Sequence, residues 1–358
     1  MKKRIASILL ASALCLGLAA CGGGSSTAST PAPAADANKE LTISDVWPDG
    51  TTVYIDVPAK AGGGTDLYTR YLTQALGELY PKVSFVVNNY DTTEVGRENA
   101  KNADPDGTHF LIHHAGMAIE YFAGKTNVSA KDDYKTVGVV NLGGPQAIIA
   151  KPNAPYTNFA ELKDYIDAHP GDVVIGCSLG GASQASFYGI MNSYGEGYDQ
   201  KVNWVQCGSE ADKLTQTASS SIDIANCSIP NAQAYEADGK LTVLGCIGPQ
   251  TATLSSMEEL LGTTLGDQYK TGPEQGLSQG TFECSYYIWA PAATPDNICK
   301  AVNEAVMAAC GQQSYIDGNK AMATFVDAVN YADSQATFER EWDIMDQTAT
   351  QMGVNTRK

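Results

Sequence analysis

The segment Gly176–Ser183 contains the pattern G-x-S-x-G, which in one class of hydrolases holds a nucleophilic serine on a sharp turn between a strand and a helix. Such a serine, here Ser178, depends on a histidine that follows it in the chain. The four histidines of the sequence all lie before it, at His109, His113, His114 and His169. We therefore predict that the protein is not an enzyme, and a surface serine hydrolase is the least favoured alternative.

A second glycine-rich loop, Ala61–Asp66, stands at the same kind of junction, between an expected strand at 52–57 and an expected helix at about 65–79. Glycines let backbone N–H groups approach a ligand, and the first turn of a helix carries a partial positive charge. The loop has neither the spacing of a Walker phosphate loop nor that of a dinucleotide fingerprint. We interpret it as one wall of a small-anion site, with Gly176–Ser183 as the other wall. The alternative is a tight turn that packs the helix against the sheet.

His113 and His114 follow a short apolar run that predicts a strand. Neighbouring side chains of a strand point to opposite faces of the sheet, so these two histidines are not expected to bind one metal ion together. One of them is expected to pack inward and the other to lie at a loop, and a contact to the ligand from this loop, at 114–117, is the alternative. The sequence has no C-x-x-C pattern and no Cys/His cluster at zinc spacing, so we predict no metal site and no cofactor.

Strand-like and helix-like segments alternate along the chain, which favours an α/β fold with largely parallel sheets. Asn158, followed by Glu161, has the spacing of a helix N-cap, and a last amphipathic helix is expected at about 334–352. More than one small core is needed for a chain of this length, so two lobes are expected, with the ligand beyond the carboxyl ends of the strands. We assign 41–143 with 288–358 to one domain and 144–287 to the other.

The formal net charge is −17, which argues against nucleic acid and anionic membrane surfaces as partners. Of the nine cysteines, seven lie beyond Cys21, in the part expected to fold. An odd number cannot pair completely. Both free buried thiols and one or two disulfides are compatible with the sequence.

The first residues have the pattern of a secretory signal peptide: three basic residues, a short apolar run, and then Leu18-Ala19-Ala20-Cys21. This ending resembles the lipobox of bacterial lipoproteins, and the alternative is an ordinary signal peptide. We predict a lipoprotein signal peptide at 1–20, lipidation of Cys21 and a flexible linker at 21–40, which is rich in Gly, Ser, Ala and Pro. The protein is then expected at the extracytoplasmic face of the cell membrane, in contact with the membrane only through its lipid.

An ordered set of short motifs resembles the substrate-binding proteins of tripartite tricarboxylate transporters, also called Bug receptors. The set runs over nearly the whole mature chain: Val57–Asp66 with Arg70, Asp104–Thr108, Phe159–Leu162 with His169–Gly171, Gly176–Ser183, Gly208–Leu214 with Asp223, Gly239–Leu241 and Ala290–Pro295. The resemblance implies a bilobed, type II periplasmic-binding-protein-like fold of the Venus-flytrap kind, with two α/β domains and a ligand cleft between them. It also implies capture of a small organic anion, a di- or tricarboxylate or a related acid, for the permease subunits of a tripartite transporter.

The resemblance places the substrate-binding residues on the two glycine-rich loops and at a few further positions: Ala61, Gly62, Gly63, Gly64, Thr65, Asp66, Ala115, Gln146, Ser178, Gly180, Gly181, Ser183, Asn226 and Cys227. One segment departs from the family. Asn88–Gly96 stands where relatives have an asparagine followed by a Gly/Ala-rich stretch, so the sequence does not choose among carboxylates, amino acids and nicotinate-type acids. A ligand sensor of the same fold, feeding a signalling partner, is the alternative function.

Overall fold

The computed structural model describes residues 39–278, 282 and 284–357, all within one compact unit, Ala37–Lys358. The predicted signal peptide, Cys21 and nearly all of the predicted linker lie outside the described residues. Ten strands are described: β1 Thr52–Val57, β2 Ser84–Asn89, β3 His109–His114, β4 Tyr134–Asn141, β5 Gln146–Ala150, β6 Val174–Cys177, β7 Asn203–Gln206, β8 Ile224–Ser228, β9 Thr242–Ile247 and β10 Tyr286–Pro291.

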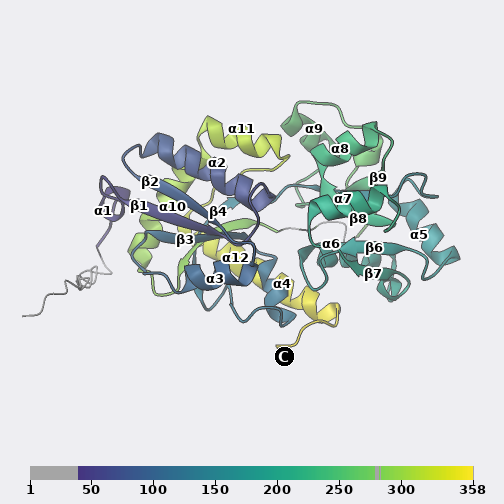
Figure 1. Ribbon diagram of the computed structural model, residues 1–358, viewed down its shortest axis with the longest axis horizontal. Coiled ribbons are helices and arrows are strands. Elements are labelled where there is room, and N and C mark those ends of the chain that lie inside the picture. The colour runs from purple at the N-terminus through teal and green to yellow at the C-terminus, as the bar shows by residue number, and fades with distance from the viewer. Residues whose placement is uncertain (1–38, 279–281, 283, 358) are drawn as a thin grey trace, which may run out of the picture. The chain divides into compact units, whose positions relative to one another are not determined.

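Twelve α-helices are described, and they alternate with the strands in Figure 1. Their bounds are α1 Ile43–Val46, α2 Gly64–Leu79, α3 Thr93–Lys101, α4 Met117–Phe122, α5 Phe159–Ala168, α6 Ala182–Tyr194, α7 Glu210–Ala218, α8 Ile229–Ala237, α9 Leu254–Leu261, α10 Asp296–Cys310, α11 Gln313–Ala321 and α12 Tyr331–Gln351.

The strands form two five-stranded sheets with the same internal arrangement. The first has the order β2-β1-β3-β10-β4 and the second β7-β6-β8-β5-β9. In the first sheet, β10 is antiparallel to both of its neighbours. In the second sheet, β5 is antiparallel to both of its neighbours. The predicted α/β class is therefore confirmed. The sheets are mixed, however, because one strand of each runs against the other four.

Each sheet is buried on both faces by helices. One face of the first sheet packs against α2 and α10, and the other against α4 and α12. The second sheet packs against α5 and α6 on one face and against α7, α8 and α9 on the other. This burial explains why strands such as β5 and β9 read as nearly continuous apolar runs rather than as alternating patterns.

Local sequence signals agree with the helices that they predicted. The apolar stripe at 65–79 is α2, which buries Leu72, Ala75 and Leu76 against the sheet. The side chain of Asn158 accepts a hydrogen bond from Glu161 N at 2.9 Å and caps α5. The last helix, α12, begins three residues before its predicted start. The assignment of two domains by residue number stays a prediction.

The seven described cysteines are free thiols. Six of them are buried, so they pack as small apolar side chains. Burial raises the pKa of Cys177, Cys299 and Cys310 to about 12, which keeps these thiols protonated and unreactive at neutral pH. No helix in the described part of the chain has the length and apolarity needed to cross a membrane.

Ile55→Ala tests the packing of the first sheet. Ile55 is fully buried in β1 between α2 and α10, and truncation of such a side chain leaves a cavity. We expect the free energy of unfolding to fall by about 2–5 kcal/mol. Val86→Ala, on the neighbouring strand at a 36% exposed side chain, is the matched control and should cost about 1 kcal/mol or less. Urea denaturation of both variants measures the difference, and equal losses would contradict the assigned core.

Candidate functional site

A cavity of about 150 Å³ lies where the chain passes between the two sheets. This is the size of an engineered apolar cavity that holds one benzene molecule. Fourteen residues line it: Tyr68, His114, Leu142, Gly143, Gly144, Gln146, Ala182, Ser183, Ser186, Asn226, Ile247, Phe282, Cys284 and Tyr286. They come from both sheets, from α2 and α6, and from the two segments that connect the sheets.

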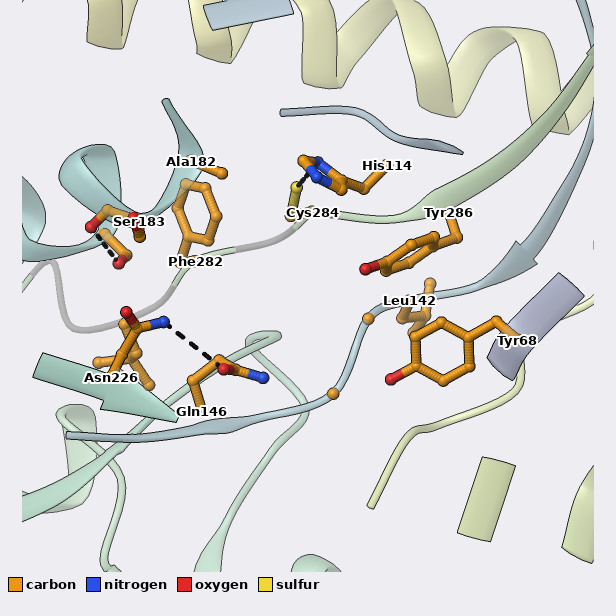
Figure 2. A pocket seen from close by; sticks show the side chains of 14 residues that line it. Tyr68, His114, Leu142, Gln146, Ala182, Ser183, Asn226, Phe282, Cys284 and Tyr286 are labelled. Atoms are coloured by element: carbon orange, nitrogen blue, oxygen red, sulfur yellow. Dashed lines mark hydrogen bonds between the residues drawn. The ribbon is translucent and has the colours of Figure 1, made fainter. Parts of the chain in front are cut away.

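One end of the cavity is polar. Gln146 and Asn226 lie there on neighbouring strands of the second sheet, opposite Ser183 (Figure 2). Helix α6 begins at Ala182, and the N–H groups of Ala182 and Ser183 belong to the first turn, where a helix offers no partner. The hydroxyl of Ser183 accepts a hydrogen bond from Ser178 N at 2.7 Å, so its own proton can be donated. This end therefore presents donors and a helix dipole to a ligand.

The other end is aromatic. Tyr68 and Tyr286 meet edge to face with ring centroids 4.8 Å apart, and Figure 2 shows them together with Leu142 and His114. The hydroxyl of Tyr68 shares a 2.6 Å hydrogen bond with Thr324 Oγ1. Burial raises the pKa of Tyr68 to about 12, so the phenol stays neutral. This wall suits an apolar or flat uncharged body.

No lysine, arginine, aspartate or glutamate is among the fourteen lining residues. Burial lowers the pKa of His114 to about 4, so its imidazole is uncharged near pH 7. The Cys284 thiol lies 3.5 Å from His114 Nδ1 and accepts a hydrogen bond from Gly116 N at 3.2 Å. The cavity walls thus act through hydrogen bonds and dipoles rather than through direct ion pairs.

Gly143 lies where the two connecting segments pass each other. Its φ of +74° is a left-handed conformation, and a Cβ atom there would lie 2.9 Å from the carbonyl oxygen of Cys284. A side chain at this position would therefore combine backbone strain with a collision. The wall of the cavity depends on a glycine at a position outside the two glycine-rich loops.

Three of the residues predicted to bind substrate line the cavity, namely Gln146, Ser183 and Asn226. The first loop, Ala61–Asp66, lies behind the aromatic wall. A Cβ atom on Gly64 would be 3.7 Å from the ring of Tyr68 and 3.9 Å from the hydroxyl of Tyr286. Within the loop, Gly62 N donates to Asp66 Oδ2 at 2.8 Å. The loop thus lies next to the two tyrosines rather than among the fourteen lining residues, and its direct contacts with a ligand stay a prediction.

The second loop is closed by its own hydrogen bonds. The N–H groups of Ser178, Leu179 and Gly180 donate to side-chain oxygens of Ser183, Gln206 and Gln184 at 2.7, 2.9 and 2.6 Å. Gly181 N donates to Ser178 O at 3.1 Å. These amides already have partners, so the donors available to a ligand are those at the start of α6. Direct ligand contacts from Ser178, Gly180 and Gly181 stay a prediction.

The two remaining predicted residues are buried beside the cavity. Ala115 N donates to Ser285 O at 2.9 Å, next to the connecting segment. Cys227 packs in the core between the second sheet and α7–α9. Sequence reasoning missed most of the aromatic wall, including Tyr68 and Tyr286. It anticipated a contact after the strand at 110–112, and His114 provides a lining residue there.

Acid should destabilise the protein through His113 and His114. The pKa of His114 falls from 6.5 to about 4 on folding, and burial also lowers that of His113. The unfolded chain therefore binds more protons, and the free energy of unfolding should decrease as the pH falls from about 6.5 towards about 4. Urea midpoints at pH 7 and pH 5 measure the decrease, which His114→Asn should reduce. The exposed His169→Asn should leave it unchanged, and the same reduction in both variants would contradict this assignment.

Solved structures share this fold. A Rhodopseudomonas palustris protein solved with adipate has a TM-score of 0.70 and 21% identity, over 86% of this chain and 98% of that one. The periplasmic binding protein BugD has a TM-score of 0.68 and 19% identity, over 85% of this chain and 98% of that one. MatC of R. palustris, solved with bound malate, has a TM-score of 0.67 and 18% identity, over 84% of this chain and 99% of that one. At these identities the likeness establishes a periplasmic-binding-protein fold.

The family follows from the sequence match. The family described as the tripartite tricarboxylate transporter family receptor matches residues 85–339, most of the chain, and this range includes most of the cavity lining and both connecting segments. Members of such a family bind solutes and do not transform them. The chain therefore belongs to the tripartite tricarboxylate transporter receptor family and is a solute-binding protein rather than an enzyme.

Proposed function

We propose that this protein binds a small carboxylate outside the cell and presents it to the permease subunits of a tripartite transporter. The observation that carries the proposal is the polar end of the cavity, where α6 begins at Ala182 with free donors beside Asn226 and Gln146. Structures of the same fold that hold malate and adipate support it. The family match supports the transporter partner.

In the proposed complex, the carboxylate faces the first turn of α6. The N–H groups of Ala182 and Ser183, together with the Ser183 hydroxyl, donate to its oxygens, and the helix dipole stabilises the negative charge. The body of the ligand lies against Tyr68 and Tyr286. The two predicted domains, 41–143 with 288–358 and 144–287, would close on it by a hinge motion.

A screen of unmodified protein lacking residues 1–21 tests the proposal. The panel contains aliphatic and aromatic mono-, di- and tricarboxylates, with amino acids and uncharged amides as comparisons, and the readout is thermal unfolding. A ligand at a hundred times its Kd should raise the free energy of unfolding by about 2.7 kcal/mol. Stabilisation by at least one carboxylate is the expected result. No response to any carboxylate in the panel would contradict the proposed function.

Ala182→Pro removes one of the proposed ligand donors without breaking the helix. Proline is favoured at the first position of a helix, and the extended backbone of Gly181, with φ −136° and ψ −176°, suits a residue before proline. We expect carboxylate affinity to fall at least tenfold, since a hydrogen bond to a charged group contributes about 1.5–3 kcal/mol. Calorimetric titration measures the affinity.

The matched control is Thr93→Pro, at the first position of α3, which contributes no lining residue to the cavity. Both variants should keep the circular dichroism and cooperative unfolding of the parent protein. Only Ala182→Pro should lose affinity. Equal affinities of the two variants would show that the α6 amide does not contact the ligand.

Membrane attachment through Cys21 is part of the proposal. The lipobox-like ending Leu18–Cys21 motivates it. Cys21→Ala removes the site of lipidation, so the protein should move from the membrane fraction to the soluble fraction of bacteria that express it. Cys15→Ala, six residues earlier in the same segment, should leave the protein with the membrane. Retention of Cys21→Ala in the membrane fraction would contradict the lipid anchor.

A further inference from the structure

A lysine is buried directly behind the polar end of the cavity. Lys213 lies on α7 with a residue exposure of 8%, and its ammonium donates to Asn226 Oδ1 at 2.6 Å. Asn226, also 8% exposed, lines the cavity. Among the described residues, no ion pair includes Lys213, and this hydrogen bond is the one that its ammonium makes.

Such a charge is unfavourable in an empty site. A buried ammonium loses its hydration, and buried cations are normally paired with anions. Burial lowers the pKa of Lys213, and the Cys177 and Cys207 thiols, the Glu210 carboxylate on its own helix and the Cys227 thiol oppose this shift without cancelling it. The Glu210 carboxylate accepts hydrogen bonds from Ser228 N, the Ser228 hydroxyl and Asn231 Nδ2, at 2.9, 2.6 and 2.7 Å, and is not within ion-pair distance of the Lys213 ammonium. A negative charge in the cavity would offset the cost that remains.

The contact with Lys213 also fixes the direction of the amides that face the ligand. An ammonium can only donate, so Asn226 must turn its Oδ1 towards Lys213 and its Nδ2 away from it. Asn226 Nδ2 then lies 3.5 Å from Gln146 Oε1, which leaves Gln146 Nε2 free to donate (Figure 2). The buried charge therefore makes both amides present N–H groups to the cavity, although the charge itself does not line it.

The aromatic end has the opposite character. Its lining residues include no cation. Burial raises the pKa of both Tyr68 and Tyr286, and the Glu210 carboxylate acts in the same direction to a smaller extent. A second carboxylate at this end would lose its hydration without gaining a cation. An uncharged, apolar body would bury its surface there at no such cost.

We infer that Lys213, acting through Asn226, makes this site selective for a single carboxylate on an uncharged apolar or aromatic body. The inference rests on the proposed function and narrows its ligand class from carboxylates in general to monocarboxylates. Lys213 is a positioning residue in this account, because it orients and polarises Asn226 and does not touch the ligand.

Two matched sets of probes test the inference on the protein lacking residues 1–21. The first is hexanoate, its neutral amide hexanamide, and adipate, which adds a second carboxylate to the same chain. The second is benzoate, benzamide and terephthalate. Affinities are measured by calorimetric titration for the parent protein, Lys213→Met and Lys213→Arg. Lys240→Met, at an exposed lysine on the same half of the chain, is the control.

At least one monocarboxylate should bind the parent protein about tenfold or more tightly than its dicarboxylate partner. Lys213→Met should lower the affinity for that monocarboxylate about tenfold or more, and it should change the affinity for the neutral amide less than about threefold. Lys213→Arg should restore much of the affinity, and Lys240→Met should match the parent. Without ligand, Lys213→Met should unfold at the same or a higher temperature, because a buried charge has been removed.

A pH series separates a charge effect from a packing effect. Burial lowers the pKa of Lys213, so monocarboxylate affinity of the parent should decline at alkaline pH as this ammonium loses its proton. Burial raises the pKa of the neighbouring Cys177 thiol to about 12 and also raises the pKa of the Cys207 and Cys227 thiols, which opposes their ionisation at alkaline pH. The decline should be absent in Lys213→Arg, whose guanidinium keeps its charge.

Two results would overturn the inference and leave the carboxylate receptor standing. One is tighter binding of adipate and terephthalate than of both monocarboxylates. The other is unchanged monocarboxylate affinity in Lys213→Met. Lys213→Met could also lose affinity for the acid, affinity for the neutral amide and thermal stability together. That pattern would overturn the inference, since it indicates a structural lysine. Failure of the parent protein to bind any carboxylate would instead contradict the proposed function itself.

Discussion

The chain must pass from the first sheet to the second and back, and the cavity exists because both passages occur at the same place. The outward passage joins β4 to β5 and the return joins β9 to β10. In each sheet, the strand that directly follows a passage is the one antiparallel member, β5 or β10. The requirement for Gly143, whose Cβ would meet the backbone of Cys284, shows how closely the two passages approach. Tyr286 and Gln146, the first residues of these strands, are therefore brought to one cavity.

The lining of the proposed anion site contains no lysine, arginine, aspartate or glutamate. Direct ion pairing would require burying a charge in the lining, and an unpaired charge in an empty cavity is strongly unfavourable. Backbone N–H groups at the start of α6 and the Ser183 hydroxyl can stabilise a carboxylate without this cost, because they are dipoles. The glycine-rich loop before α6 contributes to this stabilisation indirectly. Its own amides bond to Ser183, Gln206 and Gln184, which hold the start of the helix in place.

Much of the fold could be predicted from the sequence because helix periodicity and capping are local signals. The stripe of α2 and the cap at Asn158 are examples. The site could be predicted only in part. Spacing identified Gly176–Ser183 as a strand-to-helix junction, but not that Gln206, on another strand, would occupy one of its amides. Tyr68 and Tyr286 reach the cavity through sheet order and strand direction, which depend on contacts between residues distant in sequence.

The position of Lys213 in the sequence is a signal for the polar end of the cavity. Helix α7 buries Lys213, Leu214 and Thr217, so the lysine occupies the core face of an amphipathic helix. A lysine on that face usually extends its ammonium to water. Lys213 remains buried because Asn226, on the adjacent strand, accepts its hydrogen bond. A lysine at a core position requires a polar partner for its ammonium, and here that partner, Asn226, lines the cavity.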